Sequence, residues 1–229
     1  MRARKTTRRS ASSVITNTRE RVLDVAEQLF AQRGLDAVSI RDITSAASVN
    51  LGAINYHFRT KENLISEVIA RRIHPLTNER LCALERLERA GGNPPPTLEA
   101  VLEAIFRPAV EQSMDPKRGG TTFGKLMARC LVEPHPAVEA VLRTDFDEVV
   151  KRFDTALMRV MPELTAEDVF WRMHLLIGAL HQSLLMMDRP LPDGRRLCLD
   201  ADTYVRRFVA FAAAGFRADL PPKPEPRKK

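Results

Sequence analysis

The sequence has few of the features that mark secreted, membrane-spanning or metal-binding proteins. Its three cysteines, Cys82, Cys130 and Cys198, are odd in number, far apart and without any Cys-x-x-Cys or Cys/His ligand spacing. We expect them to be buried thiols in a reducing compartment rather than disulfides or metal ligands. The uncharged run from Met173 to Met187 is shorter than the roughly 20 residues that a membrane-spanning helix requires. These absences predict a cytoplasmic chain with no transmembrane segment and no membrane partner.

Catalytic motifs are missing as well. No glycine-rich phosphate loop, nucleophile elbow, metal pair or pair of carboxylates with plausible geometry occurs in the sequence. We therefore expect no enzymatic activity, no cofactor and no metal site. What the chain does have is 229 residues of which 44% are hydrophobic, enough for one large domain or two small ones around a real core.

Positive charge is concentrated at the N-terminal end. Residues 1–61 contain 11 basic and 5 acidic residues, whereas the rest of the chain is close to neutral. A localised positive field is typical of a surface that meets a phosphate backbone, although a basic membrane-binding face is the competing interpretation. The first 18 residues are rich in Arg and Ser and free of acid. We interpret them as a flexible cationic arm, with a targeting segment as the alternative.

The hydrophobic spacing predicts helices and almost no strands. Asn17 followed by Glu20 forms a capping-box pattern for a first helix that Gly34 ends. Pro75 should kink or end the fourth helix. The expected N-caps along the chain are Asn17, Ser39, Asn50, Thr60, Thr97, Thr165 and either Asp200 or Asp202.

The pattern predicts an all-α fold with a three-helix domain of helix-turn-helix form in front of a larger helical domain. The expected segments are a flexible basic arm at 1–16, the helix-turn-helix at 17–63, the helical domain at 64–217 and a disordered tail at 218–229. The loop "GGNPPP", Gly91 to Pro96, is not expected to be a domain boundary, because the helix entering it belongs to both parts.

Specific motifs occur between Thr18 and Ile69. They are A-x-x-L-F at Ala26 to Phe30 and G-x-x-x-x-[ST] at Gly34 to Ser39. A third motif, an aromatic residue followed by F-x-x-K-x-x-L, ends the match with Phe58, Lys61 and Leu64. Over these roughly 50 residues the chain resembles the DNA-binding domain of the TetR (tetracycline repressor-like) family of bacterial transcription regulators. The resemblance implies a homodimer that binds double-stranded DNA at a palindromic operator and responds to a small molecule.

The sequence departs from that family pattern in two places. Ser48 stands where the turn usually has Gly, so it is expected to adopt a left-handed or bridge conformation. Leu51 and Ala53 replace a Lys and a Thr, so base preferences do not transfer from a typical member. The version N-x-x-A-x-N-Y-H-F resembles a subgroup that includes regulators answering to fatty acids or acyl-coenzyme A.

The predicted recognition helix has an inward and an outward side. Ile54 and Phe58, four residues apart, should face the core of the domain, which leaves the polar residues around them outside. Asn can pair with adenine, and Tyr and His can donate to phosphate oxygens, whereas the competing interpretation makes them ordinary packing residues. Lys61 at the start of the next helix could hold a phosphate. The predicted DNA-binding residues are Ser39, Arg41, Asn50, Leu51, Ala53, Asn55, Tyr56, His57 and Lys61.

The helix predicted after Thr165 is apolar on nearly every side, so protein must cover it on two opposite sides. Its own domain can cover one side and a second copy of the chain the other. The predicted interface residues are Leu176, Leu180, Leu184, Met187, Phe208 and Phe211.

A stripe on the same helix also suggests a cavity, because Gly178 in its interior costs roughly 1 kcal/mol relative to Ala. The alternative is close helix packing at Gly178, with the histidines satisfied inside the core. His174 and His181 are about 10 Å apart along a helix, too far to share a metal ion. The predicted pocket residues are Phe106, Phe123, Met127, Cys130, Trp171, His174, Gly178 and Gln182.

The resemblance implies a ligand-responsive transcription regulator, a repressor that a small hydrophobic effector releases from DNA. A fatty acid or an acyl-coenzyme A is the favoured effector. The alternative is a DNA-binding architectural or adaptor protein without an inducer, which would bind DNA without sequence preference and with strong salt dependence.

Overall fold

The computed structural model describes residues 7–90, 95–187, 190–196 and 199–219, with side chains from Asn17 onward. Over these ranges the chain is helical, apart from its connecting loops and one isolated bridge between Pro190 and Arg196. The helices are α1 (Thr7–Arg33), α2 (Ile40–Ala47), α3 (Leu51–His57), α4 (Lys61–Ala90), α5 (Leu98–Met114), the 3₁₀ turn η1 (Pro116–Arg118), α6 (Gly120–Val132), α7 (Pro136–Val160), α8 (Ala166–Met186) and α9 (Ala201–Arg217). The predicted all-α fold is confirmed. In the described ranges, no helix combines the length and the apolar character needed to cross a membrane.

Local sequence signals account for the helix-turn-helix. Ser39 and Asp42 form the predicted capping box at the start of α2, and Ser48 ends α2 with φ 52° and ψ 48°, the left-handed conformation expected at this position. The Asn50 side chain accepts the Ala53 N–H at 2.9 Å and starts α3. Only three residues, Ser48 to Asn50, therefore connect α2 to α3.

The first helix starts earlier than predicted. Asn17 is not its N-cap, because α1 begins at Thr7 and Asn17 lies within it. The sequence between Thr7 and Asn17 contains neither Gly nor Pro, so nothing in it breaks a helix. Part of the predicted flexible arm is therefore helical. Residues 1–6 of that arm and residues 220–229 of the predicted tail lie outside the described residues.

Two prolines lie inside helices. The prediction that Pro75 could end the fourth helix is wrong, because α4 continues to Ala90, and α5 likewise continues past Pro108 to Met114. An interior proline costs about 3 kcal/mol, and burial of a Leu side chain returns about 1.5–3 kcal/mol. Leu76 and Leu84, both beyond Pro75, are buried, so their burial offsets the lost backbone hydrogen bond.

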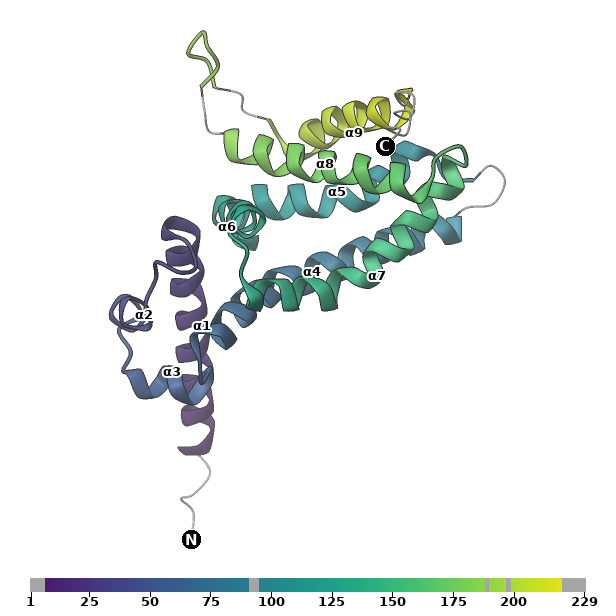
Figure 1. Ribbon diagram of the computed structural model, residues 1–229. Coiled ribbons are helices and arrows are strands. Elements are labelled where there is room, and N and C mark those ends of the chain that lie inside the picture. Colours follow the sequence, from purple (N-terminus) through teal and green to yellow (C-terminus); the bar gives the residue numbers. More distant parts are fainter. Residues whose placement is uncertain (1–6, 91–94, 188–189, 197–198, 220–229) are drawn as a thin grey trace, which may run out of the picture.

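The long helix α4 joins the two parts of the molecule (Figure 1). Its first turns pack against α1, and its later turns lie beside α7, while α8 and α9 lie over α5 on the side away from the helix-turn-helix. One continuous hydrophobic core extends from Val22 in α1 to Phe216 in α9. The helix α4 therefore connects the distal helices with the helix-turn-helix.

Candidate nucleic-acid interface

The third helix has the two sides that the sequence predicted. Ile54 and Phe58 are each 1% exposed, whereas Leu51 is 55% exposed, Tyr56 is 74% exposed and Asn55 is also on the surface. Because the inward pair packs into the core of α1, α2 and α4, α3 is held with its outward face free. Ala53 and His57 are half-buried at the margins of this face.

The side chains of Asn50 and Ser39 are occupied by caps. The Oδ1 atom of Asn50 already accepts a backbone N–H, so Asn50 cannot present a free donor–acceptor pair to adenine. Ser39 Oγ accepts the Asp42 N–H at 3.2 Å and donates to Asp42 Oδ2 at 2.6 Å. The Ser39 hydroxyl and the Ser39 backbone N–H, which both donate to the Asp42 carboxylate, hold the pKa of Asp42 below its usual value. The Asn55 side chain makes no hydrogen bond with any described residue, so it is a better candidate than Asn50 for contact with a base.

Basic side chains flank this face. Arg41 is exposed on α2, and Lys61, in the first turn of α4, donates to the backbone oxygen of Asp36 at 3.2 Å. Arg59 lies between α3 and α4, is exposed, and has φ 67°, in the left-handed region. Arg59 was not predicted. Its signal in the sequence is a basic residue directly after the buried Phe58, where the chain must turn into α4.

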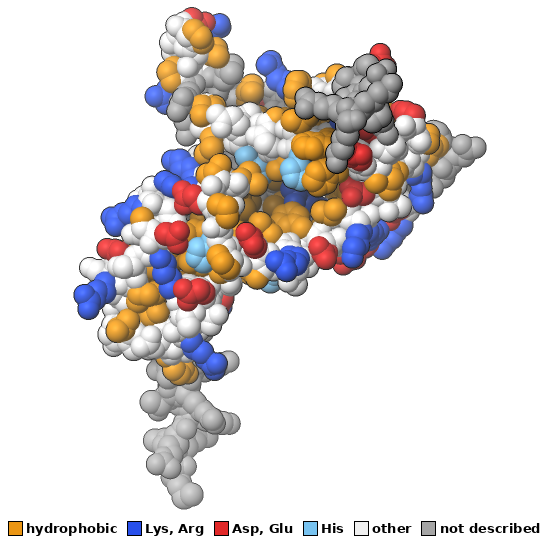
Figure 2. Space-filling view, in the orientation of Figure 1, with side chains coloured by type: hydrophobic (Ala, Val, Ile, Leu, Met, Phe, Trp, Pro, Cys, Tyr) orange, Lys and Arg blue, Asp and Glu red, His pale blue; other side chains and the backbone are white. Residues whose placement is uncertain are grey.

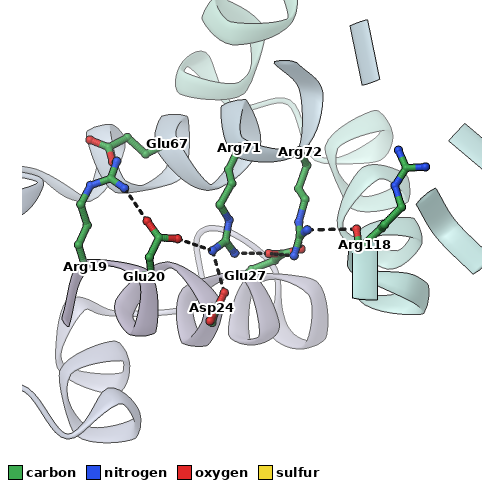
Figure 3. Close-up of polar contacts among 8 residues, drawn as sticks. All are labelled: Arg19, Glu20, Asp24, Glu27, Glu67, Arg71, Arg72 and Arg118. Carbon is green, nitrogen blue, oxygen red and sulfur yellow. Dashed lines mark hydrogen bonds and ion pairs between the residues drawn. The ribbon is translucent and has the colours of Figure 1, made fainter. Parts of the chain in front are cut away.

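A buried carboxylate binds α1 to α4 (Figure 3). The Glu27 side chain, 3% exposed, accepts from Arg72 Nε and Nη2 at 2.8 Å each and from Arg71 Nη2 at 2.5 Å. Arg72 also donates to the backbone oxygen of Arg118 in η1 at 3.1 Å. This network therefore connects the helix-turn-helix with the turn that precedes α6.

A second link runs from α6 to the end of α1. Arg129 Nε donates to the Ala31 oxygen at 2.9 Å and Arg129 Nη2 to the Gln32 oxygen at 2.8 Å, while Glu133 pairs with the same guanidinium. The last carbonyls of a helix carry partial negative charge, which a cation stabilises. Glu27, Arg72 and Arg129 were missed in the sequence. The one available signal was Glu27, a carboxylate between Ala26 and Phe30 on a buried face.

The predicted pocket residues differ in their burial and position. Phe106, Phe123 and Met127 are buried in the core, and burial raises the pKa of the half-buried Cys130 thiol to about 12. Trp171 and His174 are on the surface. Gly178 and Gln182 line an open groove of about 720 Å³ between α6, α8 and the end of α1.

The orientation of α8 about its axis differs from the prediction. Leu176 and Leu180, predicted for the dimer interface, are buried within the chain's own core, as is Phe208 of α9. Leu184 and Met187 are half-buried. Instead, Phe170, Trp171 and Leu175 of α8 and Phe211 of α9 are the exposed large hydrophobic residues. Of the six predicted interface residues, Phe211 alone is exposed, at 64%.

A helix-turn-helix that presents a free helix face, flanked by basic side chains and carried on an all-helical chain, defines a DNA-binding transcription regulator. Residues 22–68 match the model of the bacterial regulatory proteins of the tetR family, and residues 103–215 match the tetracyclin repressor-like C-terminal domain. The chain belongs to the TetR family, and the resemblance found in the sequence is confirmed.

Curated relatives match the N-terminal part. The chain is 47% identical over 51 residues to the HTH-type transcriptional regulator AcrR of Shigella flexneri, which covers 22% of this chain and 24% of AcrR. It is 43% identical over 51 residues to the HTH-type transcriptional repressor KstR2 of Rhodococcus jostii, covering 22% and 25%. The match thus spans about a quarter of each relative's length.

Solved structures match over most of the chain. The fatty acid degradation regulator FadR from Bacillus halodurans superposes with a TM-score of 0.62 at 15% identity, covering 88% of this chain and 97% of that one. A bacterial regulatory protein of the tetR family from Rhodococcus RHA1 superposes with a TM-score of 0.59 at 17% identity, covering 87% and 96%. At these identities the likeness establishes the fold.

Proposed function

We propose that this TetR-family regulator is a repressor that binds a palindromic operator as a homodimer and leaves it when a small hydrophobic acyl effector fills the C-terminal domain. The observation that carries the proposal is the outward face of α3, on which Asn55 and Tyr56 are exposed while Ile54 and Phe58 fix the helix from below. Such a face reads base edges in the major groove, and two-fold symmetry supplies two half-sites.

The uncovered side of α8 supports the dimer. Phe170, Trp171 and Leu175 are each more than half exposed, although large side chains of this kind are normally covered. A Cβ added at Gly178 on α8 or at Gly215 on α9 would meet no atom within 4 Å. These glycines allow another helix to approach closely. In a two-fold symmetric dimer, the same apolar side of a second copy of the chain would cover this surface.

Two contacts support a coupling between effector and operator. Arg72 holds both Glu27 of α1 and the Arg118 carbonyl of η1, and Arg129 of α6 holds the end of α1. In our proposal the effector favours an arrangement in which α6 and α4 move together as rigid bodies, which changes the spacing of the two α3 helices. The effector's acyl class is suggested by the α3 sequence and by the name of the structural neighbour FadR.

The α3 assignment predicts two different mutant phenotypes. Lys61→Ala should weaken binding to all DNA sequences alike and lower the salt slope of the binding constant by about 1, because one phosphate contact is lost. Asn55→Ala should change base preference at one position of each half-site at a cost of about 1–3 kcal/mol. Binding titrations against a panel of single-base operator variants at several salt concentrations measure both effects.

Lys151→Ala is the matched control, since Lys151 is exposed on α7 far from α3. It should leave affinity and salt slope unchanged. If Asn55→Ala and Lys61→Ala both reduced affinity uniformly for every sequence, the base-reading role of Asn55 would be wrong.

The link through Arg129 predicts a local change in stability. Arg129→Ala removes two charge-assisted hydrogen bonds to the last carbonyls of α1, which should lower the free energy of unfolding by about 1–3 kcal/mol. Amide hydrogen exchange in residues 28–35 should accelerate more than elsewhere. Arg143→Ala, a substitution at an exposed residue of α7, is the control. Equal exchange in both variants would show that Arg129 does not hold α1.

A further inference from the structure

Arg80 is a buried cation in the distal part of α4. It is 9% exposed, and its guanidinium lies 5.4 Å from the centre of the Phe146 ring of α7. Its Nε atom donates to the Ile105 backbone oxygen of α5 at 2.8 Å. Within the described ranges no carboxylate lies at ion-pair distance from Arg80, so its charge has no counter-ion there.

The charge persists despite the burial. Burial lowers the pKa of the Arg80 guanidinium to about 10, which still leaves it protonated at neutral pH. A buried ion without a partner costs several kcal/mol, so such a residue is usually compensated. Arg172, equally buried, shows how: both of its terminal nitrogens donate to carbonyls at the end of α9, those of Gly215 and Ala218.

The two terminal nitrogens of Arg80 have no such acceptors among the described residues. The residue as a whole is 9% exposed, so Arg80 is not completely enclosed by the protein. Figure 2 shows the molecule hollowed between α8 and the pair α4–α7, with mostly hydrophobic walls, histidine, and a Lys or Arg side chain at the floor. Arg80 lies between α5 and α7, since it donates to the Ile105 oxygen and packs against the Phe146 ring. Its two terminal nitrogens thus form a planar pair of donors that no described acceptor uses.

His181 of α8 is close enough to be influenced by this cation. Burial lowers the pKa of His181, its bond to the Ile177 oxygen opposes that shift, and the positive charge of Arg80 lowers the pKa further. Because a carbonyl can only accept, the Nδ1 atom of His181 carries the proton that it donates to Ile177 at 2.8 Å. The neutral ring adds no second positive charge, so one cation stands among apolar and neutral groups.

We propose that Arg80 binds the free carboxylate of the effector, whose apolar body lies against the hydrophobic walls between α5, α7 and α8. This inference rests on the proposed function and adds the chemical class of the effector to it. Two parallel N–H donors of an arginine match the two oxygens of a carboxylate. A single cation balances a monoanion, whereas a dianionic phosphate ester would need further donors. The effector is accordingly an acid with its carboxylate free, and not a thioester of that acid.

The test compares a charged ligand with a neutral one of the same shape. Decanoate and decanamide are titrated into the full-length protein by isothermal calorimetry, without DNA. Decanoate should bind the native chain about 30-fold more tightly than decanamide, because a hydrogen-bonded charge is recognised in one and not in the other. Arg80→Met, which keeps the apolar stem, should abolish this ratio, while the control Arg86→Met, an exposed change on the same helix, should preserve it.

Two further results separate ligand recognition from damage to the fold. Arg80→Met should melt at a temperature equal to or above that of the native chain, since it removes an uncompensated buried charge. Should Arg80→Met not fold, Arg80→Lys keeps the charge without the planar fork and should show an intermediate ratio. The proposal is overturned if the native chain binds both ligands equally, or if Arg80→Met retains the ratio. A chain that still selected a palindromic duplex in that case would keep the proposed function and lose only this inference.

Discussion

Leu175→Arg should yield a monomer whose affinity for the operator is lower by about three orders of magnitude. Leu175 is 72% exposed in the single chain and lies beside Trp171 on the uncovered side of α8. A charge in the middle of an apolar interface must be desolvated without a partner, which costs several kcal/mol. Each half-site would then have to be bound independently, and the advantage of two linked recognition helices would be lost.

Sedimentation measures the mass of the Leu175→Arg variant, and fluorescence anisotropy measures its DNA affinity. Val150→Arg is the control, because Val150 is a similarly exposed hydrophobic residue on α7, 50% exposed. That control should remain dimeric and bind DNA normally. Since Leu175 is already exposed in the single chain, both variants should fold. A Leu175→Arg dimer with native affinity would place the interface elsewhere.

Glu27→Gln should lower the free energy of unfolding by about 3–5 kcal/mol, the effect of removing one partner from a buried ion pair. The Glu27 carboxylate is 3% exposed and pairs with both Arg71 and Arg72. The neutral amide would leave Arg72 without a carboxylate partner among the described residues, and Arg71 with the more exposed Asp24 and Glu20. Because these arginines belong to α4, the loss should also loosen the helix-turn-helix and reduce operator affinity. Denaturant unfolding measures the first effect and a binding titration the second.

Glu20→Gln is the matched comparison for Glu27→Gln. Glu20 is 48% exposed in its side chain and lies 3.5 Å from the same Arg71, so its contribution should be within about 1 kcal/mol. Equal losses in the two variants would show that burial of Glu27 does not determine its contribution, and that the network of Figure 3 is a surface feature.

The parts of the fold that were predictable are those governed by neighbours in the chain. Capping boxes at Ser39 and Thr165 depend on residues three positions apart, and both occur as predicted. That the side chains of Ile54 and Phe58 face the core follows from helical periodicity alone. The left-handed Ser48 followed from the family pattern, in which Gly usually stands at this position of the turn. The helix-turn-helix is thus encoded locally, which is why its sequence resemblance was specific.

The C-terminal domain was less predictable, because α8 is hydrophobic on nearly every side. A helix of this kind has no polar face to show its orientation, so the prediction assigned Leu176 to the dimer interface and Trp171 to the pocket. The structure buries Leu176 in the core and exposes Trp171. Packing against α6, α7 and α9 makes that choice, and a single sequence carries no direct signal for it.

Long-range polar contacts were also beyond the sequence. The bond between Glu27 and Arg72 joins residues 45 positions apart, and the bond between Arg129 and Ala31 joins residues 98 apart. Neither pair has a characteristic spacing. Arg80 is a similar case, since only the packing of α5 and α7 against α4 shows that this residue is buried without a carboxylate among the described residues.

Selection of duplexes from a random DNA pool by the purified full-length protein tests the central claim most directly. The account predicts enrichment of an inverted repeat whose two halves are contacted symmetrically, with two chains bound to each duplex. A pool that stayed unselected, with binding that depended steeply on salt and not on sequence, would contradict it and would instead indicate an architectural DNA-binding protein.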